Sequence, residues 1–167
     1  PDVNAYISAR ITMNYANGLI RFGEYNRAIT LITESIDLFT SINDQYYISR
    51  TKLIKYIIYL FQGGGENAEL YLFEAYKIAQ ELSDPQLLRD CYLYLSDHFS
   101  RKNDYSQSIS FSKKGLQLAE QLNNDIYIAR YHKELGSLYL TIGEPDRALS
   151  YLNRAHSYYQ SINSAAL

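Results

Sequence analysis

The side chains that could do acid–base or nucleophilic chemistry in this chain are few and scattered. The three histidines, His98, His132 and His156, lack the spacing of a metal site, and the single cysteine, Cys91, cannot form an intrachain disulfide or a thiolate metal cluster. Asp97 next to His98 is the nearest approach to an acid–base pair, but adjacent residues on a helix point about 100° apart. We therefore expect the histidines to be polar or seam residues and Cys91 to be a buried structural thiol.

One stretch, "LIKYIIYLFQGGGENAE" at residues 53–69, suggests a membrane anchor, a phosphate-binding loop, or a buried helix followed by a turn. The apolar run contains Lys55 and is much shorter than the roughly 20 residues of a spanning helix. The three glycines are not followed by the Lys-Ser/Thr pair of a phosphate loop. Zinc-protease and nucleophile-elbow motifs are also missing from the sequence. We expect a helix and a wide turn here, and a chain that is no enzyme and holds no cofactor or metal.

The composition points to a helical protein with a nearly balanced charge. The 167 residues carry 16 Lys and Arg against 18 Asp and Glu, for a formal charge of −2. Without clustered cations, direct binding of nucleic acid or anionic lipid is not expected. Only three prolines are present, and this favours helices over short strands. One free thiol favours the cytoplasm but leaves the periplasm possible, and the start "PDVNAYISAR" is not a signal peptide.

The sequence aligns with itself when it is shifted by 40 residues. Three sets of equivalent positions carry similar residues: a turn residue, a small residue five positions later, and a second small residue seven positions further on. These sets are Gly23, Gly63, Asn103 and Gly143; Ala28, Ala68, Ser108 and Ala148; and Ser35, Ala75, Gly115 and Ala155. An internal repeat of this length is typical of solenoid proteins.

Each repeat reads as two helices joined by a turn. Apolar residues recur at helical spacing, and Asp, Asn or Ser at the end of each repeat would cap the helix that follows. We predict eight helices, at 3–21, 25–41, 45–61, 66–82, 86–101, 105–121, 125–141 and 145–161. They would form one all-α domain of four repeats, at about 5–44, 45–84, 85–124 and 125–164.

These repeats resemble the tetratricopeptide family. The resemblance is clearest in the last repeat, which has Leu135, Gly136 and Tyr139 in its first helix and Ala148 and Ala155 in its second. It implies a right-handed α-solenoid of four helix–turn–helix repeats. The usual unit has about 34 residues, and the longer period is similar to the variant in bacterial signalling and transcription regulators.

The residues at the end of the chain match the start of another repeat. "NSAAL" aligns with "NDQYY" of the second repeat, and the last helix would leave Leu149, Leu152 and Tyr159 uncovered. We expect the chain to be a fragment of a longer protein, and we expect more helices, another domain or a second copy to cover this face.

The resemblance implies a concave groove lined by the first helix of each repeat. The candidate partner-binding residues are Arg10, Asn14, Asn17, Arg21, Arg50, Leu53, Ile57, Leu60, Phe61, Tyr94, Arg101 and Arg130. The same stripe includes Met13, Ile20, Ile54, Asp90, Leu93, Asp97, Lys133, Glu134 and Ser137. The positions of the carboxylate clamp of chaperone-binding members would be Met13, Asn17, Ile57, Asp90 and Tyr94, and this set cannot hold a carboxylate.

Two features of the groove leave alternatives open. Arg10, Arg50 and Arg130 recur at one repeat position, where they would contact a ligand or form interhelical ion pairs with neighbours such as Asp90. Asn14 and Asn17 would bind a peptide backbone or have a solvated or capping role.

The second repeat departs from the pattern of the others. Tyr56 occupies a site that is small elsewhere, Lys55 replaces an apolar or aromatic residue, and Gly64 and Gly65 replace an acidic residue and a tyrosine. We predict that this repeat is the most distorted. Its first helix is apolar on its groove side too, so it is either buried by neighbouring protein or a ligand site.

The function that these features favour is binding of a protein or peptide, as the sensor or assembly domain of a larger bacterial regulatory protein. Leu53, Ile57, Leu60 and Phe61 would be the apolar anchors, and Arg10, Arg50, Asn14 and Asn17 the polar contacts. The alternatives are a homodimerisation module and a regulatory domain fused to a signalling enzyme such as a nucleotide cyclase or kinase.

Overall fold

A computed structural model describes residues 2–64 and 68–165, with side chains up to residue 162. In these residues it contains eight helices and no strand: α1 (Val3–Arg21), α2 (Tyr25–Ser41), α3 (Gln45–Phe61), α4 (Ala68–Leu82), α5 (Pro85–Arg101), α6 (Tyr105–Gln121), α7 (Asp125–Thr141) and α8 (Pro145–Ala165). The predicted helices are confirmed, although α8 continues past 161. The described part of α4 begins at Ala68, so the predicted start at 66 and the expectation for Gly65 lie outside the described residues.

Each described junction between helices carries a residue with left-handed backbone, and after α3 Gly64 is a second one. Apart from Gly64, these residues recur at every twentieth position: Gly23, Asn43, Gly63, Ser83, Asn103, Asn123 and Gly143. The φ of Asn103 is 61°, close to the 76° of Gly23 and the 80° of Gly143. Asparagine and glycine tolerate this region well, which explains why Asn103 can replace a glycine at the same turn.

An Asp or Asn side chain just before α3, α5, α6 and α7 caps the first turn of that helix. The carboxylate of Asp44 accepts a hydrogen bond from the Tyr47 amide at 3.1 Å, and the Asn124 side chain accepts one from the Tyr127 amide at 3.2 Å. Asp84 and Asp104 cap α5 and α6 in the same way. These bonds satisfy amides that lack a partner within the helix.

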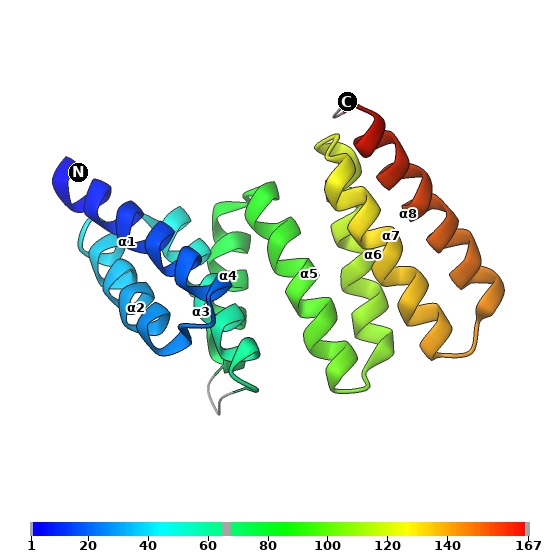
Figure 1. Ribbon diagram of the computed structural model, residues 1–167, viewed down its shortest axis with the longest axis horizontal. Helices are drawn as coiled ribbons and strands as arrows, with labels where there is room; N and C mark the ends of the chain where they lie inside the picture. Colours follow the sequence, from blue (N-terminus) through cyan, green and yellow to red (C-terminus); the bar gives the residue numbers. More distant parts are fainter. Residues whose placement is uncertain (1, 65–67, 166–167) are drawn as a thin grey trace. The chain divides into compact units, whose positions relative to one another are not determined.

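The chain divides into two compact units, residues 1–87 and 88–167 (Figure 1). In the first unit, α1, α2 and α3 share one apolar core that includes Ala9, Met13, Ile32, Phe39 and Ile58. A small residue at the helix crossing, Ser35, lies in this core and donates a hydrogen bond to the Ala9 carbonyl at 2.9 Å. The prediction of one continuous domain stays a prediction.

The core of the second unit depends on a large residue packed against a glycine. Tyr131 of α7 is fully buried, and its hydroxyl donates to the Arg89 carbonyl of α5. A Cβ added at Gly115 of α6 would lie 2.1 Å from the Tyr131 ring, so only glycine fits at this position. Ser96, Ser108 and Ser112 are buried together and joined by hydrogen bonds of 2.6 to 3.0 Å.

The unusual residues of the second repeat are accommodated inside the first unit. Tyr56 is 1% exposed and Lys55 is 7% exposed. The ammonium of Lys55 donates to the Thr33 hydroxyl at 2.8 Å and lies 4.6 Å from the centre of the Tyr71 ring. A cation–π contact and one hydrogen bond thus hold this buried cation. The predicted distortion of the repeat stays a prediction.

Candidate functional site

The four candidate residues on α1 share its exposed surface. Arg10, Asn14, Asn17 and Arg21 are all exposed, in keeping with their helical spacing. Met13, from the same predicted stripe, is instead 4% exposed and belongs to the core.

The apolar candidates on α3 differ widely in exposure. Leu53 is 6% exposed, Ile57 and Leu60 are half-buried, and Phe61 is 60% exposed. The Phe61 ring stacks in parallel on Tyr25 of α2, with 6.0 Å between ring centres. Only Phe61 among these four therefore offers a large apolar surface, and the buried Leu53 offers almost none. Their role as anchors stays a prediction.

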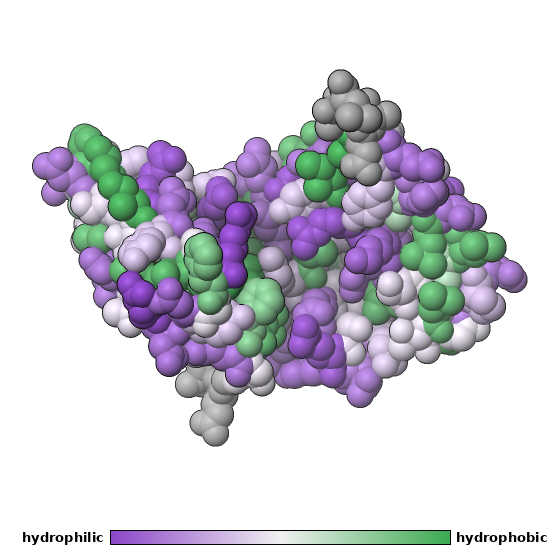
Figure 2. Space-filling view, viewed as in Figure 1, coloured by the Kyte–Doolittle hydropathy of each residue, from purple (hydrophilic) through white to green (hydrophobic). Residues whose placement is uncertain are grey.

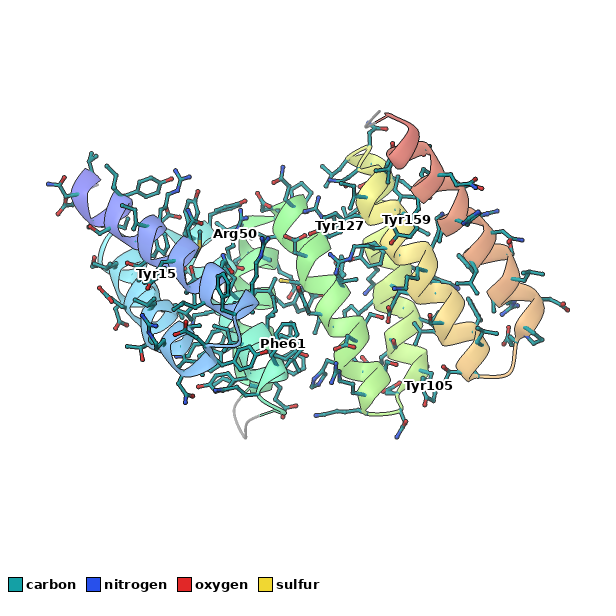
Figure 3. The ribbon with its side chains drawn as sticks, viewed as in Figure 1. Tyr15, Arg50, Phe61, Tyr105, Tyr127 and Tyr159 are labelled. Atoms are coloured by element: carbon teal, nitrogen blue, oxygen red, sulfur yellow. The ribbon has the colours of Figure 1, made fainter. Side chains whose placement is uncertain are left out.

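Arg10 and Arg50 lie near a group of tyrosines in the first unit. We call Tyr6, Arg10, Tyr46, Tyr47 and Arg50 the Arg–Tyr surface. Arg10 lies over the Tyr6 and Tyr47 rings, at 5.5 and 5.8 Å from their centres, and donates to the Tyr6 hydroxyl at 3.4 Å. Arg50 projects from α3 (Figure 3) and is exposed. In the described part of the chain neither guanidinium has a carboxylate within ion-pair distance.

Tyr47 packs both on the core and on the other residues of this surface. Its ring stacks on the buried Phe39 at 4.8 Å and meets the edge of Tyr6 at 5.6 Å. The hydrogen bond with the Tyr6 hydroxyl, followed by burial, raises the pKa of Tyr47, while Arg10 and Arg50 oppose this shift. The Tyr47 ring is thus packed against the core, and the Arg10 guanidinium lies over it and over Tyr6.

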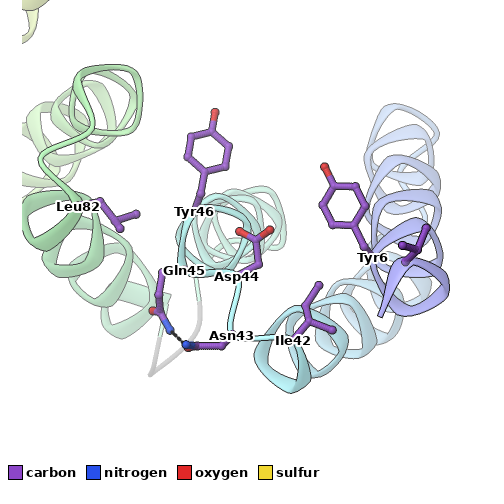
Figure 4. A pocket seen from close by; sticks show the side chains of 8 residues that line it. Tyr6, Ile42, Asn43, Asp44, Gln45, Tyr46 and Leu82 are labelled. Carbon is purple, nitrogen blue, oxygen red and sulfur yellow. Dashed lines mark hydrogen bonds between the residues drawn. The ribbon is translucent and has the colours of Figure 1, made fainter. Parts of the chain in front are cut away.

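Two cavities meet at Tyr6. The larger, of about 570 Å³, lies among the N-terminal ends of α1 and α3 and the C-terminal end of α4. In Figure 4 the Tyr6 and Tyr46 rings stand on either side of Asp44, and Gln45 donates to the Asn43 side chain at 2.9 Å. The smaller cavity, of about 200 Å³, is lined by Tyr6, Ile7, Arg10, Ile11 and Asn14. A concave surface of aromatic and apolar side chains with few polar groups is the usual form of a binding site.

On the corresponding surface of the second unit, two arginines are paired with carboxylates. Arg101 donates to Asp97 at 2.8 Å, and Asp90 accepts from its neighbour Arg89 at 2.8 and 3.0 Å. Arg130 lies 5.4 Å from the centre of the Tyr127 ring. Asp90 bonds to Arg89 on its own helix, and the role of Arg130 stays a prediction.

Tyr94 and Glu134 complete this surface of the second unit. The pKa of Tyr94 is raised by burial, and the nearby charge of Arg130 opposes the shift. The pKa of Glu134 is raised by burial and by Asp97. Acidic side chains on this surface balance the arginines, so it differs in charge from the Arg–Tyr surface.

The potential nucleophile and bases are placed as the sequence suggests. Cys91 is fully buried, and burial raises the pKa of its thiol to about 12, so the thiol stays protonated near neutral pH. His98 and His132 are buried, and His156 is exposed. Within the described residues, His, Cys, Asp and Glu side chains form no group that could hold a metal ion. No helix of this part combines the length and apolar character needed to cross a bilayer.

Sequence reasoning missed four residues that shape these surfaces: Tyr6, Tyr46, Tyr47 and Arg89. A signal was present for two of them, because Tyr6 precedes Arg10 by four residues and Tyr47 precedes Arg50 by three. Residues at these spacings are neighbours on a helix. Nothing in the sequence alone indicated that Tyr6 and Tyr47, from different repeats, lie in contact.

Solved structures with the same fold include two with low sequence identity. BtubC (BKLC) from P. vanneervenii is similar with a TM-score of 0.79 and 18% identity, over 93% of this chain and 64% of BtubC. A signal transduction ATPase with numerous domains and a tetratricopeptide repeat sensor, from Pyrococcus horikoshii, is similar with a TM-score of 0.80 and 17% identity, over 99% of this chain and 26% of the ATPase. The chain thus spans less than two thirds of either protein.

The sequence comparisons add no family. No protein-family model matches the chain, and no curated protein matches it. The structural similarity shows an all-α helical-repeat fold of the solenoid class.

Proposed function

We propose that this chain is a protein-binding module of the tetratricopeptide kind, with the long repeat found in bacterial signalling and transcription regulators. In a larger protein it would act as the sensor or assembly domain. The Pyrococcus ATPase, which is similar over 26% of its chain, has a tetratricopeptide repeat sensor, and this supports the assignment. The binding partner would be a protein segment that carries acidic and apolar side chains.

The observation that carries the proposal is the pair of exposed arginines, Arg10 and Arg50, which have no carboxylate partner among the described residues. Arg10 lies over the Tyr6 and Tyr47 rings, next to a cavity of about 570 Å³, and the exposed Arg50 lies one turn after Tyr47 on α3. Guanidinium groups bind carboxylates in two-point contacts, and aromatic rings supply apolar contact area. A partner with acidic residues between leucines or aromatics satisfies both requirements. The Asn14 and Asn17 side chains, further along α1, would contact its backbone.

A direct test measures peptide binding by fluorescence anisotropy. The probes are a labelled short peptide of alternating glutamate and leucine, and the same peptide with lysine in place of glutamate. We expect the acidic peptide to bind and the basic one not to bind. Because a hydrogen bond to a charged group contributes about 1.5–3 kcal/mol, the double variant R10A/R50A should lose at least about tenfold in affinity. Added salt should weaken the binding.

The matched control is Arg147→Ala. Arg147 is also exposed and lies over a tyrosine ring, 5.6 Å from the centre of Tyr139, but it pairs with Glu144 at 2.8 Å. R147A should bind the acidic peptide as the unchanged chain does. Equal loss in R147A and in R10A/R50A would show that the attraction comes from overall charge, and the proposed site would be wrong.

A further inference from the structure

One side of α1 exposes a row of large apolar residues. Val3, Ile7, Ile11 and Tyr15 succeed one another at intervals of four and are 66%, 49%, 63% and 52% exposed. We call this row the N-face; Figure 2 shows it as a green band along α1, at the upper left. Helix α1 contains no acidic residue, and the hydroxyl of Tyr15 is held by Arg27 of α2 at 3.2 Å.

The same repeat positions are covered inside each unit. In α3 they are Tyr47, Thr51 and Lys55, which pack on the preceding α1–α2 hairpin: Tyr47 on Phe39, Thr51 on Met13, and Lys55 on Thr33. In α7 they are Tyr127, Tyr131 and Leu135, and the last two are fully buried. The N-face is therefore the surface on which this fold packs a preceding helical hairpin.

The opposite surface of such a hairpin is exposed on α7 and α8. Ile126, Leu149 and Tyr159 are 56%, 61% and 37% exposed. We call these residues the C-face; Figure 2 shows apolar surface over α8, at the right. Their equivalents in the first repeat are Tyr6, Ile29 and Phe39, all of which pack into the core of the first unit, and Phe39 is fully buried.

We propose that the N-face of one copy of this chain packs on the C-face of a second copy. The geometry of the contact already exists inside the chain, where the α1–α2 hairpin packs on α3 through the equivalents of these two faces. Both faces are apolar, and each is the counterpart of the other at the same repeat register. The contact is heterologous, so a dimer leaves one N-face and one C-face uncovered and can add a further copy.

Two substitutions test this contact by analytical ultracentrifugation of the full chain over a range of concentrations. Ile11→Asp spoils the N-face and Leu149→Asp spoils the C-face, and both residues are more than half exposed, so the helices should still form. The unchanged chain should associate beyond a dimer as its concentration rises. Each variant alone should be a monomer.

A mixture of the two variants distinguishes this arrangement from others. I11D supplies an intact C-face and L149D an intact N-face, so the mixture should form a one-to-one dimer and nothing larger. The dimer also shows that both variants are folded. A strict monomer for the unchanged chain would overturn the proposal, as would an L149D variant that still dimerises, because that dimer would join two N-faces.

The outcome is separable from the proposed peptide binding. R10A/R50A leaves the C-face untouched and L149D leaves the Arg–Tyr surface untouched. L149D should therefore bind the acidic peptide as the unchanged chain does. If peptide binding fails while the mixture of I11D and L149D forms its dimer, the packing of copies stands without the proposed function.

Discussion

At the same two repeat positions, the first unit has an acidic residue opposite a basic one, whereas the second unit has two basic residues. In the first unit, Lys52 of α3 forms an ion pair with Glu74 of α4, with 2.5 Å between nitrogen and oxygen. Two repeats later, the corresponding residues are His132 of α7 and Arg154 of α8. The second unit thus has two basic side chains where the first has an ion pair. The pKa of His132 is lowered by burial and by the charge of Arg154.

The buried seams of the two units differ in a similar way. The first unit has Ser35 and Thr51, both fully buried and hydrogen-bonded to backbone carbonyls at 2.9 and 2.6 Å. The second unit has Gly115 and Tyr131 at the same positions. Where the first unit has a serine and a threonine, the second has a glycine and a much larger tyrosine. The repeat thus tolerates different side chains when residues on neighbouring helices change together.

The largest expected loss of stability comes from adding a side chain at Gly115, where it would meet Tyr131. Gly115→Ser copies the first unit's residue into the second, where its Cβ would lie 2.1 Å from the Tyr131 ring. Overpacking of this kind costs typically 1–3 kcal/mol, and we expect about 3 kcal/mol. Urea denaturation followed by circular dichroism measures the loss.

Two further variants sharpen this result. The double variant G115S/Y131T restores the pairing of the first unit and should recover part of the lost stability. Gly18→Ala is the control, because a Cβ there has no atom within 4 Å and alanine favours a helix. If G115S is as stable as the unchanged chain, the packing of Tyr131 on Gly115 is not what excludes a side chain.

A smaller effect is expected from reversing the charge of Glu74. Glu74→Arg places two cations together at a half-buried position, and we expect a loss of about 1 kcal/mol. The same urea titration measures it. The control is Glu81→Arg, because Glu81 is exposed and 3.9 Å from its partner Lys77. Equal effects of the two substitutions would show that Lys52 and Glu74 contribute no more than an exposed pair does.

The smallest effect concerns acid sensitivity at His132. The pKa of His132 is lowered from its ordinary value of 6.5. As the pH falls through 6.5, the unfolded chain takes up the proton first, so the folded chain loses stability on acidification. Arg154→Glu removes the second cause of the shift and should reduce this loss, with little change in stability at pH 8. An NMR titration of the His132 ring should show its pKa moving upward, and an unchanged or lower pKa would contradict this account.

The helices and their ends could be predicted because their signals are local. A left-handed residue marks each described junction, and at several of them a capping Asp or Asn follows, as at Asn103 and Asp104. The alignment of the repeats also predicted which positions hold small residues, such as Ser35 and Gly115. Such features depend on backbone geometry, which the side chains at the junction determine directly.

The partners of the charged residues could not be predicted in this way. Lys52 and Glu74 lie on neighbouring helices, and their contact depends on how the helices are rotated. The contact of Tyr6 with Tyr47 has the same origin. At Asp90, the carboxylate bonds to Arg89 of the same helix, a partner that the repeat alignment did not indicate. A long side chain can reach several neighbouring groups, and sequence spacing alone does not predict which of these groups it contacts.

The most direct test of the binding site is a charge reversal on both sides of the contact. The chain with R10E/R50E and the unchanged chain are each titrated with the glutamate–leucine and lysine–leucine peptides. If Arg10 and Arg50 bind the acidic groups of the partner, the unchanged chain prefers the acidic peptide and the reversed chain prefers the basic one. If the reversed chain still prefers the acidic peptide, these two arginines are not the binding site.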